Sequence, residues 1–452
     1  MKSAAVQLKP DPARDLMDAY WLPFTPNRAF KKMPRVVVAA KDMHYYTADG
    51  RAIVDATSGL WCTNAGHNRE PIVQAIQQQA ARLDYAPSFQ FTHPAAFEIA
   101  DRVVRLAPDP LNHVFFCNSG SEAVDTALKV AIGFHHVRGA ASRTRLIGRD
   151  RGYHGVGFGG LSVGGIAQNR KMFGPLLAGS GHLRSTYSRE HQAFTQGEPS
   201  WGAHLADDLA DLVRLHDAST IAAVIVEPMA GSTGVLPAPQ GYLQRLRAIC
   251  DRHGILLIFD EVITGFGRLG HAFAAERYAV VPDMIVFAKG ITSGTVPMGG
   301  VIVSDNVHAA FMNGPEHVIE LFHGYTYSAH PLACAAALAT VQLYEDEGLF
   351  ERAKKLEPLW AERAGELRNC PAVADIRSVG LAAGIDLSVV PAAAARIGHE
   401  IMHRAFADES MMVRGVGNTL IVAPPLIVSE PQIDQIFTAL DRSIRATVGA
   451  TK

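Results

Sequence analysis

The residues of this sequence that could do chemistry stand where long apolar runs stop. Glu227, Asp260 and Lys289 each follow an uninterrupted apolar run, and these runs are residues 221–226, 255–259 and 284–288. Open α/β sheets bind ligands at the carboxyl ends of their strands, so these side chains are expected at the edge where a ligand would lie. A lysine there is partly desolvated, which lowers its pKa and makes its neutral amine available for Schiff-base chemistry.

Asp260 and Lys289 together predict a site for a pyridoxal cofactor. Such a cofactor needs a lysine for its covalent link and an acid beside its pyridine nitrogen, because a protonated ring is the better electron sink. Asp260 lies one strand–helix–strand unit before Lys289 and can supply that acid. The alternative, which the pair alone would favour, is an ordinary ion pair at a sheet edge.

The cofactor phosphate would need backbone N–H groups and hydroxyls at the start of a helix. Ser119, Gly120 and Ser121 follow an apolar run and precede a helix-period segment at residues 121–138. A helix N-terminus carries free N–H groups and a partial positive charge, which makes it an anion site. The same residues, followed by Glu122, also form a good capping box, so alone they indicate only a helix start.

A glycine-rich segment follows the strand-like residues 145–148. Tyr153 within it offers an aromatic ring that could stack on the pyridine face. Gly155, Gly157 and Gly160 match the spacing of a dinucleotide fingerprint, but we discount that match. The residues that follow are not expected to open a helix, and the acidic residue expected about twenty positions further on is missing.

The middle of the chain alternates fully apolar runs with helix-period segments. Such runs are typical of strands buried on both faces of a parallel sheet, and such segments are typical of crossover helices. Besides those named above, the runs include residues 114–117 and 301–303, and the helical segments include residues 203–216 and 242–253. The pattern predicts an α/β fold with one large domain.

From about residue 332 the pattern changes. Long helices are predicted at residues 332–346, 349–367 and 431–448, with short strands near residues 374–378 and 420–423. We therefore expect a smaller α+β domain beside the large mixed α/β domain. The expected division is an N-terminal arm with a small-domain part (1–60), a large cofactor-binding domain (61–330) and a C-terminal small domain (331–452). One continuous three-layer domain is the alternative.

The charge balance and the cysteines exclude several classes of function. Lys plus Arg (42) nearly equals Asp plus Glu (44), so neither nucleic acid nor a membrane is expected as a partner. The five cysteines are scattered, which fits neither a disulfide framework nor a zinc site, and no metal is expected. The N-terminus has no apolar h-region and no apolar run is long enough to span a membrane, so we expect a cytoplasmic protein.

Five separated motifs of this sequence, taken together, resemble those of the class III aminotransferases in order and spacing. They are residues 119–122, 153–155, 227–228, 259–262 and 288–290. Three further stretches resemble the branch of omega-amino acid:pyruvate aminotransferases, typified by beta-alanine:pyruvate aminotransferase, and they are residues 58–61, 113–116 and 322–331. The resemblance implies pyridoxal 5′-phosphate (PLP) as cofactor and the type I, aspartate aminotransferase-like fold. It also implies active sites shared across a homodimer, with a homotetramer in many members.

The resemblance implies roles for individual residues. Lys289 would be the catalytic residue that holds the cofactor and shuttles the proton, and Asp260 would pair with the pyridine nitrogen. Val262 would pack behind the ring, Tyr153 would cover its exposed face, and Thr326 of the partner subunit would help to hold the phosphate. The expected cofactor-binding residues are Ser119, Gly120, Ser121, Tyr153, His154, Glu227, Asp260, Val262, Lys289 and Thr326, and the expected substrate-binding residues are Trp61, Tyr153 and Arg414.

Two positions depart from the family's pattern. Many members have Gln where Ile263 stands, so the contact to the cofactor's ring hydroxyl is expected from elsewhere or from water. Gamma-aminobutyrate and ornithine aminotransferases carry a Glu where Ser232 stands, and that Glu can pair with the family's carboxylate-binding arginine, here Arg414. Ser232 cannot, so Arg414 is expected to stay free for carboxylate substrates.

The expected function is ping-pong transfer of an amino group from an omega-amino acid or amine to pyruvate, which yields alanine. One alternative keeps the cofactor but changes the donor, to gamma-aminobutyrate or taurine, or changes the chemistry to that of an aminomutase or decarboxylase of the same class. Another alternative is a non-catalytic PLP-binding regulatory module. The sequence has no DNA-binding basic segment, which counts against that alternative.

Overall fold

A seven-stranded sheet forms the centre of the computed structural model, which describes residues 17–388 and 396–449. Its strands, in spatial order, are β4 (His113–Cys117), β12 (Gly299–Val303), β11 (Met284–Ala288), β10 (Leu256–Asp260), β7 (Ile221–Val226), β5 (Arg145–Arg149) and β6 (Gly181–Leu183). Only β12 runs antiparallel to its neighbours. The predicted parallel α/β arrangement is therefore confirmed, with one reversed strand.

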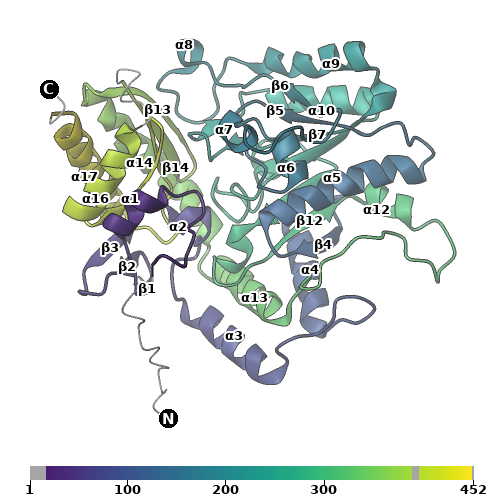
Figure 1. Cartoon of the computed structure of the whole chain (residues 1–452), viewed down its shortest axis with the longest axis horizontal. Helices are drawn as coiled ribbons and strands as arrows, with labels where there is room; N and C mark the ends of the chain where they lie inside the picture. The colour runs from purple at the N-terminus through teal and green to yellow at the C-terminus, as the bar shows by residue number, and fades with distance from the viewer. Residues whose placement is uncertain (1–16, 389–395, 450–452) are drawn as a thin grey trace.

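Helices cover both faces of this sheet (Figure 1). Alternate residues of a strand point to opposite faces, so each strand contributes to two apolar layers. One layer packs under α5 (Gly120–Val137) and includes Ile258 and Val286. The other packs under α10 (Tyr242–His253), α4 (Pro94–Leu106) and α13 (Pro331–Asp346) and includes Phe259 and Phe287.

Two four-stranded sheets lie outside the central one. The first has the order β1 (Ala39–Lys41), β2 (His44–Tyr46), β3 (Ala52–Asp55) and β15 (Met411–Met412), and the second has the order β13 (Val373–Val379), β14 (Ala382–Leu387), β17 (Thr419–Val422) and β16 (Arg414–Val416). Because β15 pairs with β3, the two ends of the chain share one sheet. Figure 1 shows the purple N-terminal strands beside the yellow helices α16 (Ile397–Asp408) and α17 (Glu430–Gly449).

The remaining elements are short or connect the sheets. They are α1 (Asn27–Lys32), α2 (Ser58–Trp61), α3 (Glu70–Arg82), α6 (Phe158–Val163), α7 (Ala167–Arg170), α8 (Arg189–Gln192), α9 (Asp208–His216), α11 (Ala274–Arg277), α12 (Asp305–Phe311), α14 (Leu349–Glu366), the strands β8 (Met229–Ala230) and β9 (Leu236–Pro237), and the 3₁₀ helices η1 (Ala203–Asp207), η2 (Ala218–Thr220), η3 (Lys289–Thr292) and η4 (Leu367–Asn369). None of the helices in the described ranges is long and apolar enough to cross a membrane.

Several predicted elements differ from those observed. Residues 203–216 were expected to form one helix, but they divide into η1 and α9, because the chain turns from 3₁₀ to α geometry at Asp208. The sequence pattern did not predict β14 or the short strands β1 to β3, since their pairing depends on residues far away along the chain. The division of the chain at residues 60 and 330 stays a prediction.

Glu261 directly follows β10 and has no exposed surface. Its carboxylate accepts hydrogen bonds from Ala274 N at 2.5 Å, from Ala275 N at 2.9 Å and from Thr264 Oγ1 at 2.8 Å. These bonds hold the start of α11 against the central sheet. Burial nevertheless raises the pKa of Glu261 to about 7, because desolvation of the charged form outweighs the three hydrogen bonds.

The raised pKa of Glu261 predicts a pH dependence of stability. The unfolded chain loses this proton above about pH 4.3, whereas the folded chain keeps it until about pH 7, so the stability contributed by protonated Glu261 is lost as the pH rises through this window. The free energy of unfolding of Glu261→Gln, relative to that of the wild type, should therefore rise by on the order of 1 to 3 kcal/mol from pH 5 to pH 8. Urea unfolding of both proteins at the two pH values measures this difference. An unchanged difference would show that Glu261 is ionised throughout.

Candidate active site

The parallel strands bring the predicted chemical residues to one edge of the central sheet. Strands β4, β7, β10 and β11 run in the same direction, so their carboxyl ends meet there. Asp260 ends β10, Glu227 follows β7 and Lys289 follows β11. Both carboxyl groups act electrostatically on the Lys289 amine. The structure thus assembles the charged residues that the apolar runs indicated.

Lys289 is held in an unusual backbone conformation. Its φ of 51° lies in the left-handed region, which costs a non-glycine residue about 1 kcal/mol or more. The next residue is fixed by a hydrogen bond from Tyr344 Oη to Gly290 O at 2.5 Å. Burial lowers the pKa of the Lys289 amine, and the nearby Asp260 carboxylate opposes this shift. A lysine with a lowered pKa offers the neutral amine that Schiff-base chemistry requires.

Asp260 is buried and paired with a histidine. Its Oδ2 lies 2.8 Å from His154 Nδ1, and its Oδ1 accepts a hydrogen bond from Val262 N at 3.1 Å. His154 is also buried, and its Nε2 has no hydrogen-bond partner within the described ranges. The histidine therefore orients the carboxylate through a single bond. The sequence indicated His154 only through the family resemblance.

Glu227 acts on the loop that carries Tyr153. Its Oε1 accepts a hydrogen bond from Tyr153 N at 2.9 Å, and its backbone carbonyl accepts one from Arg149 Nη2 at 2.7 Å. Burial raises the pKa of Glu227 to about 7, and neighbouring Asp260 adds to the rise, whereas His154 opposes it. Glu227 thus fixes the backbone beneath the ring of Tyr153.

The start of α5 combines a helix cap with an anion site. Ser119 Oγ accepts a hydrogen bond from Glu122 N at 3.2 Å, while the Glu122 carboxylate accepts one from Asn118 N at 2.8 Å. The cap leaves the N–H groups of Gly120 and Ser121 as the donors that this helix end can offer to a phosphate. A side chain at Gly120 would meet Val262, because an added Cβ would lie 2.9 Å from its Cγ2. The helix-cap interpretation is therefore confirmed, and the phosphate site stays a prediction that this helix start fits.

The glycine-rich segment after β5 wraps around a carboxylate of α5. Gly160 N donates to Asp125 Oδ1 at 2.8 Å, and a Cβ added at Gly157 would lie 2.3 Å from Asp125 Oδ2. The short helix α6 begins at Phe158, between the second and third of these glycines, and ends at Val163, so the residues that follow Gly160 complete a helix and do not open one. The dinucleotide interpretation still fails, because the Asp125 carboxylate fills the space that a phosphate would need.

Gly155 supports Ser121 from the other side of this segment. Its φ is +88°, and an added Cβ would lie 2.5 Å from Ser121 Oγ. Ser121 Oγ in turn accepts a hydrogen bond from Val156 N at 3.2 Å. The close approach of the two segments places the Ser121 hydroxyl beside the helix start.

Arg414 lies on a strand, although the glycine-rich residues 412–418 around it indicate a turn. It begins β16 and pairs with Ile421 of β17. Its neighbour Gly415 does not serve flexibility, since an added Cβ would lie 2.2 Å from Gly398 O on α16. Among the described residues Arg414 Nε is buried without a hydrogen-bond partner, and its charge acts on Tyr153. Arg414 forms no ion pair with any described residue, so its positive charge stays available to the site.

Cys62 reaches the site from the N-terminal part of the chain, and the expected substrate-binding residue Trp61 directly precedes it. Trp61 is 4% exposed and has a φ of 65°, and the Arg268 guanidinium lies 5.7 Å from its ring centre. The Cys62 thiol acts electrostatically on Lys289, and burial raises its own pKa. No pattern in the sequence indicated a role for Cys62, because only the fold brings it near the lysine.

Two expected features lie at the rim of the site or outside it. Thr326 is exposed, and its backbone carbonyl accepts a hydrogen bond from Tyr85 Oη at 3.2 Å. Ile263 is buried against the loop before Ser232, because a Cβ added at Gly231 would lie 2.9 Å from Ile263 Cδ1. Ile263 therefore makes an apolar contact at the position where many family members have Gln.

The residues at this edge fit PLP. A lysine with a lowered pKa, a buried carboxylate held by a histidine, and a capped helix start with two free N–H groups match the aldehyde, the pyridine nitrogen and the phosphate. Gly120 leaves space beside Val262 that any Cβ would fill. Within the described ranges no cluster of His, Cys, Asp or Glu has the arrangement of a metal site. The fold and this set of groups define the class of fold type I PLP enzymes.

Comparison with known proteins gives the family. The class-III aminotransferase family model matches residues 25–444. The chain is 54% identical over 433 residues to an omega-aminotransferase of Caulobacter vibrioides, and the aligned region covers 96% of this chain and 98% of that protein. It is 46% identical over 434 residues to a beta-alanine–pyruvate aminotransferase of Pseudomonas aeruginosa, with 94% and 95% covered. Its fold matches that of a PLP-bound amine transaminase from an uncultivated Pseudomonas species, with a TM-score of 0.87, 34% identity, and 95% and 98% covered.

The chain therefore belongs to the class III aminotransferases, and its cofactor is pyridoxal 5′-phosphate. The resemblance of the five sequence motifs and the predicted fold type are both confirmed.

The contact between Gly155 and Ser121 predicts a weakened cofactor site in Gly155→Ala. The new Cβ would meet the Ser121 hydroxyl and would also strain the backbone, so retention of PLP should fall about tenfold. The measurement is the amount of PLP bound per chain after dialysis against rising buffer volumes. Gly139→Ala is the matched control, because Gly139 has a φ of +79° with open space around it. Equal losses in the two variants would assign the effect to backbone strain alone.

Proposed function

We propose that this aminotransferase moves an amino group from an omega-amino acid or amine to pyruvate and so produces alanine. The relatives named above, one of them a beta-alanine–pyruvate aminotransferase, support this proposal. The observation that carries it is the guanidinium of Arg414, which acts on Tyr153 and forms no ion pair within the described ranges, with Ser232 where a paired acid would be expected. Because both substrates use one site in turn, ping-pong kinetics follow.

The side chains at the sheet edge divide the work. Lys289 holds the cofactor and afterwards moves a proton to and from the substrate carbon. Asp260 keeps the proton on the pyridine nitrogen, and His154 orients Asp260. When bound, PLP supplies the electron sink for the charge that develops at the substrate carbon.

The phosphate and the ring have separate contacts. Ser119, Gly120 and Ser121 hold the phosphate at the start of α5, and Val262 packs against Gly120 beside the ring. Tyr153, on the backbone fixed by Glu227, covers the other ring face. Trp61 lines the substrate side.

Lys289→Ala should abolish the absorption band of the covalently bound cofactor and reduce transamination at least about 100-fold, the range for a lost general acid–base group. The reason is that one amine supplies both the covalent link and the proton transfer. Absorbance spectra and alanine formation from pyruvate measure the two effects, with thermal unfolding as a check of folding. Turnover near the wild-type rate would refute the role of Lys289.

Arg414 explains how one pocket can accept two carboxylates of different reach. A guanidinium binds a carboxylate bidentately, so it orients pyruvate and beta-alanine through charge-assisted hydrogen bonds. Burial lowers the pKa of Arg414, and it stays cationic because an arginine side chain ionises far above neutral pH. Ser232 lies on the loop between β8 and β9 and carries no charge that could neutralise it.

Arg414→Ala should raise the Michaelis constant (KM) for pyruvate and beta-alanine about ten- to a hundredfold, since a hydrogen bond to a charged group contributes about 1.5 to 3 kcal/mol. A neutral amine such as 1-phenylethylamine should still react normally in a single half-reaction. Stopped-flow spectra and steady-state kinetics measure the contrast. The exposed Arg442 provides the control Arg442→Ala, which should change neither value. Equal losses for charged and neutral donors would make Arg414 structural.

A homodimer with shared active sites, and the possibility of a homotetramer, belong to the same proposal. Thr326 is exposed in the single chain and is available to a partner subunit. Large apolar side chains are exposed along three segments, among them Trp21 (87%), Phe91 (70%) and Phe322 (85%). Patches of this kind mark protein–protein contacts.

The five cysteines are free thiols, which supports a cytoplasmic location.

A further inference from the structure

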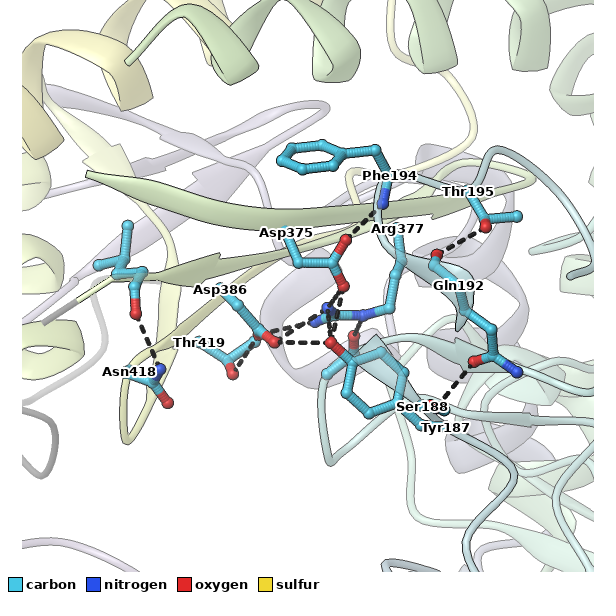
Figure 2. A network of polar contacts seen from close by, with 12 residues as sticks. Tyr187, Ser188, Gln192, Phe194, Thr195, Asp375, Arg377, Asp386, Asn418 and Thr419 are labelled. Carbon is cyan, nitrogen blue, oxygen red and sulfur yellow. Dashed lines mark hydrogen bonds and ion pairs between the residues drawn. The ribbon is translucent and has the colours of Figure 1, made fainter. Parts of the chain in front are cut away.

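A buried ionic network lies beside the site, and its hydrogen-bond partners among the described residues include none of the expected cofactor-binding residues. Its centre is Arg377 of β13, which is 3% exposed. Arg377 pairs with Asp375 through Nη1, and its Nη2 donates to Asp386 Oδ1 at 2.7 Å. Tyr187 Oη donates to Asp375 Oδ2 at 2.7 Å, and Thr419 Oγ1 donates to Asp386 Oδ1 at 2.7 Å (Figure 2).

The network joins segments that are far apart along the chain. Asp375, Arg377, Asp386 and Thr419 come from β13, β14 and β17 of one small sheet. Tyr187 comes from the connection after β6 of the central sheet, and Phe194 N of the same connection donates to Asp375 Oδ1 at 2.6 Å (Figure 2). The small sheet is thereby fastened to the central one.

The network also reaches the loop that carries Ser232. Arg377 Nε donates to Gly234 O at 3.0 Å, and a Cβ added at Gly384 would lie 2.1 Å from the same oxygen. Arg151 Nη2 donates to Thr233 O at 2.9 Å, and Thr233 Oγ1 donates back to Arg151 O at 2.9 Å. The loop is held from both sides.

Two substrate-facing residues depend on this arrangement. Tyr153 stands two residues after Arg151, whose guanidinium lies 5.1 Å from the ring centre of Tyr187. Arg414 stands on β16, which pairs with β17 so that Val416 lies opposite Thr419 and Arg414 lies opposite Ile421. The network is thus the shared support of the two groups between which a substrate carboxylate would lie.

The charged residues of this network are better explained by the geometry that they impose on their segments than by a contribution to the free energy of unfolding. Desolvation makes a buried ion pair no more stable than apolar side chains of similar volume, so such pairs are best explained by the fixed geometry that they impose. Two arginines, Arg377 and Arg151, face two carboxylates, Asp375 and Asp386, and the charges balance. Burial opposes the charge on Arg377, but the two carboxylates outweigh it and raise its pKa, and Arg377 in turn holds the pKa of Asp386 low.

We propose that Arg377 and Tyr187 are positioning residues that set the separation of Arg414 and Tyr153, and thereby the selectivity of this enzyme for substrates with a carboxylate. This inference rests on the proposed function of Arg414. It predicts that loosening the network affects pyruvate and beta-alanine and spares neutral amines.

The first test is Tyr187→Phe, which keeps the ring under Arg151 and removes only the hydroxyl that bonds to Asp375. KM for pyruvate should rise about three- to tenfold, the range for coupled neighbouring residues, while kcat and the half-reaction with 1-phenylethylamine stay unchanged. Arg377→Lys keeps the charge but not the bidentate geometry. It should raise KM for pyruvate more than Tyr187→Phe does, and it should likewise leave the half-reaction with 1-phenylethylamine unchanged.

The second test is a double-mutant cycle. If the network acts through Arg414, Tyr187→Phe should have no further effect on KM for pyruvate in the Arg414→Ala background. Additive effects in the two backgrounds would overturn the inference. So would a Tyr187→Phe enzyme in which charged and neutral donors lose activity equally.

A matched control separates positioning from general stability. Arg277 forms a second cluster with Glu198 at 2.6 Å and with Glu357 at 2.9 Å, and Glu357 also accepts a hydrogen bond from Gly380 N. Glu357→Gln should lower the midpoint of thermal unfolding. It should change neither KM for pyruvate nor the rate of the half-reaction with 1-phenylethylamine. If Arg414→Ala itself fails to distinguish the donors, the proposed function of Arg414 fails. If only Tyr187→Phe and Arg377→Lys fail to distinguish them, the network inference alone fails.

Discussion

The common direction of four strands is the constraint on which the site depends. Strands β4, β7, β10 and β11 all end at one edge, and a residue of the candidate site ends or follows each of them. The reversed strand β12 fits between β4 and β11 because it starts with Gly299, where a Cβ would lie 2.7 Å from Ser119 O. The helix start can therefore come close to the lysine that follows β11.

Charge at this edge is arranged so that few groups are left alone in an apolar environment. Asp260 has His154, and Glu227 has the N–H of Tyr153, while burial still raises the pKa of Glu227 to about 7. Lys289 shares the field of both carboxyl groups, yet burial keeps its pKa low. Buried charges are tolerated only with such partners. The half-buried Arg414 is the exception, since it forms no ion pair among the described residues, and an unpaired cation is what a carboxylate substrate requires.

The N-terminal and C-terminal parts of the chain meet over the central sheet through a second buried arginine. Arg268 has no exposed surface, and its guanidinium donates to Pro424 O at 2.6 Å, to Ser58 Oγ at 2.8 Å and to Asn64 Oδ1 at 3.1 Å. Burial lowers its pKa to about 10. Arg268 thus fixes the segment around Trp61 by hydrogen bonds to neutral groups.

Local patterns of the sequence determined every strand of the central sheet except the short β6, together with the residues that end the three longest apolar runs. Apolar runs are long enough to identify buried strands, and Glu227, Asp260 and Lys289 follow such runs directly, so the nature of the site could be predicted before its shape. The tertiary structure decided everything that depends on pairing between distant segments. It placed Cys62 near Lys289, put Arg414 on a strand, filled the glycine-rich loop with Asp125, and closed the network around Arg377. These contacts join residues far apart in sequence, and no local periodicity records which distant partner a side chain will meet.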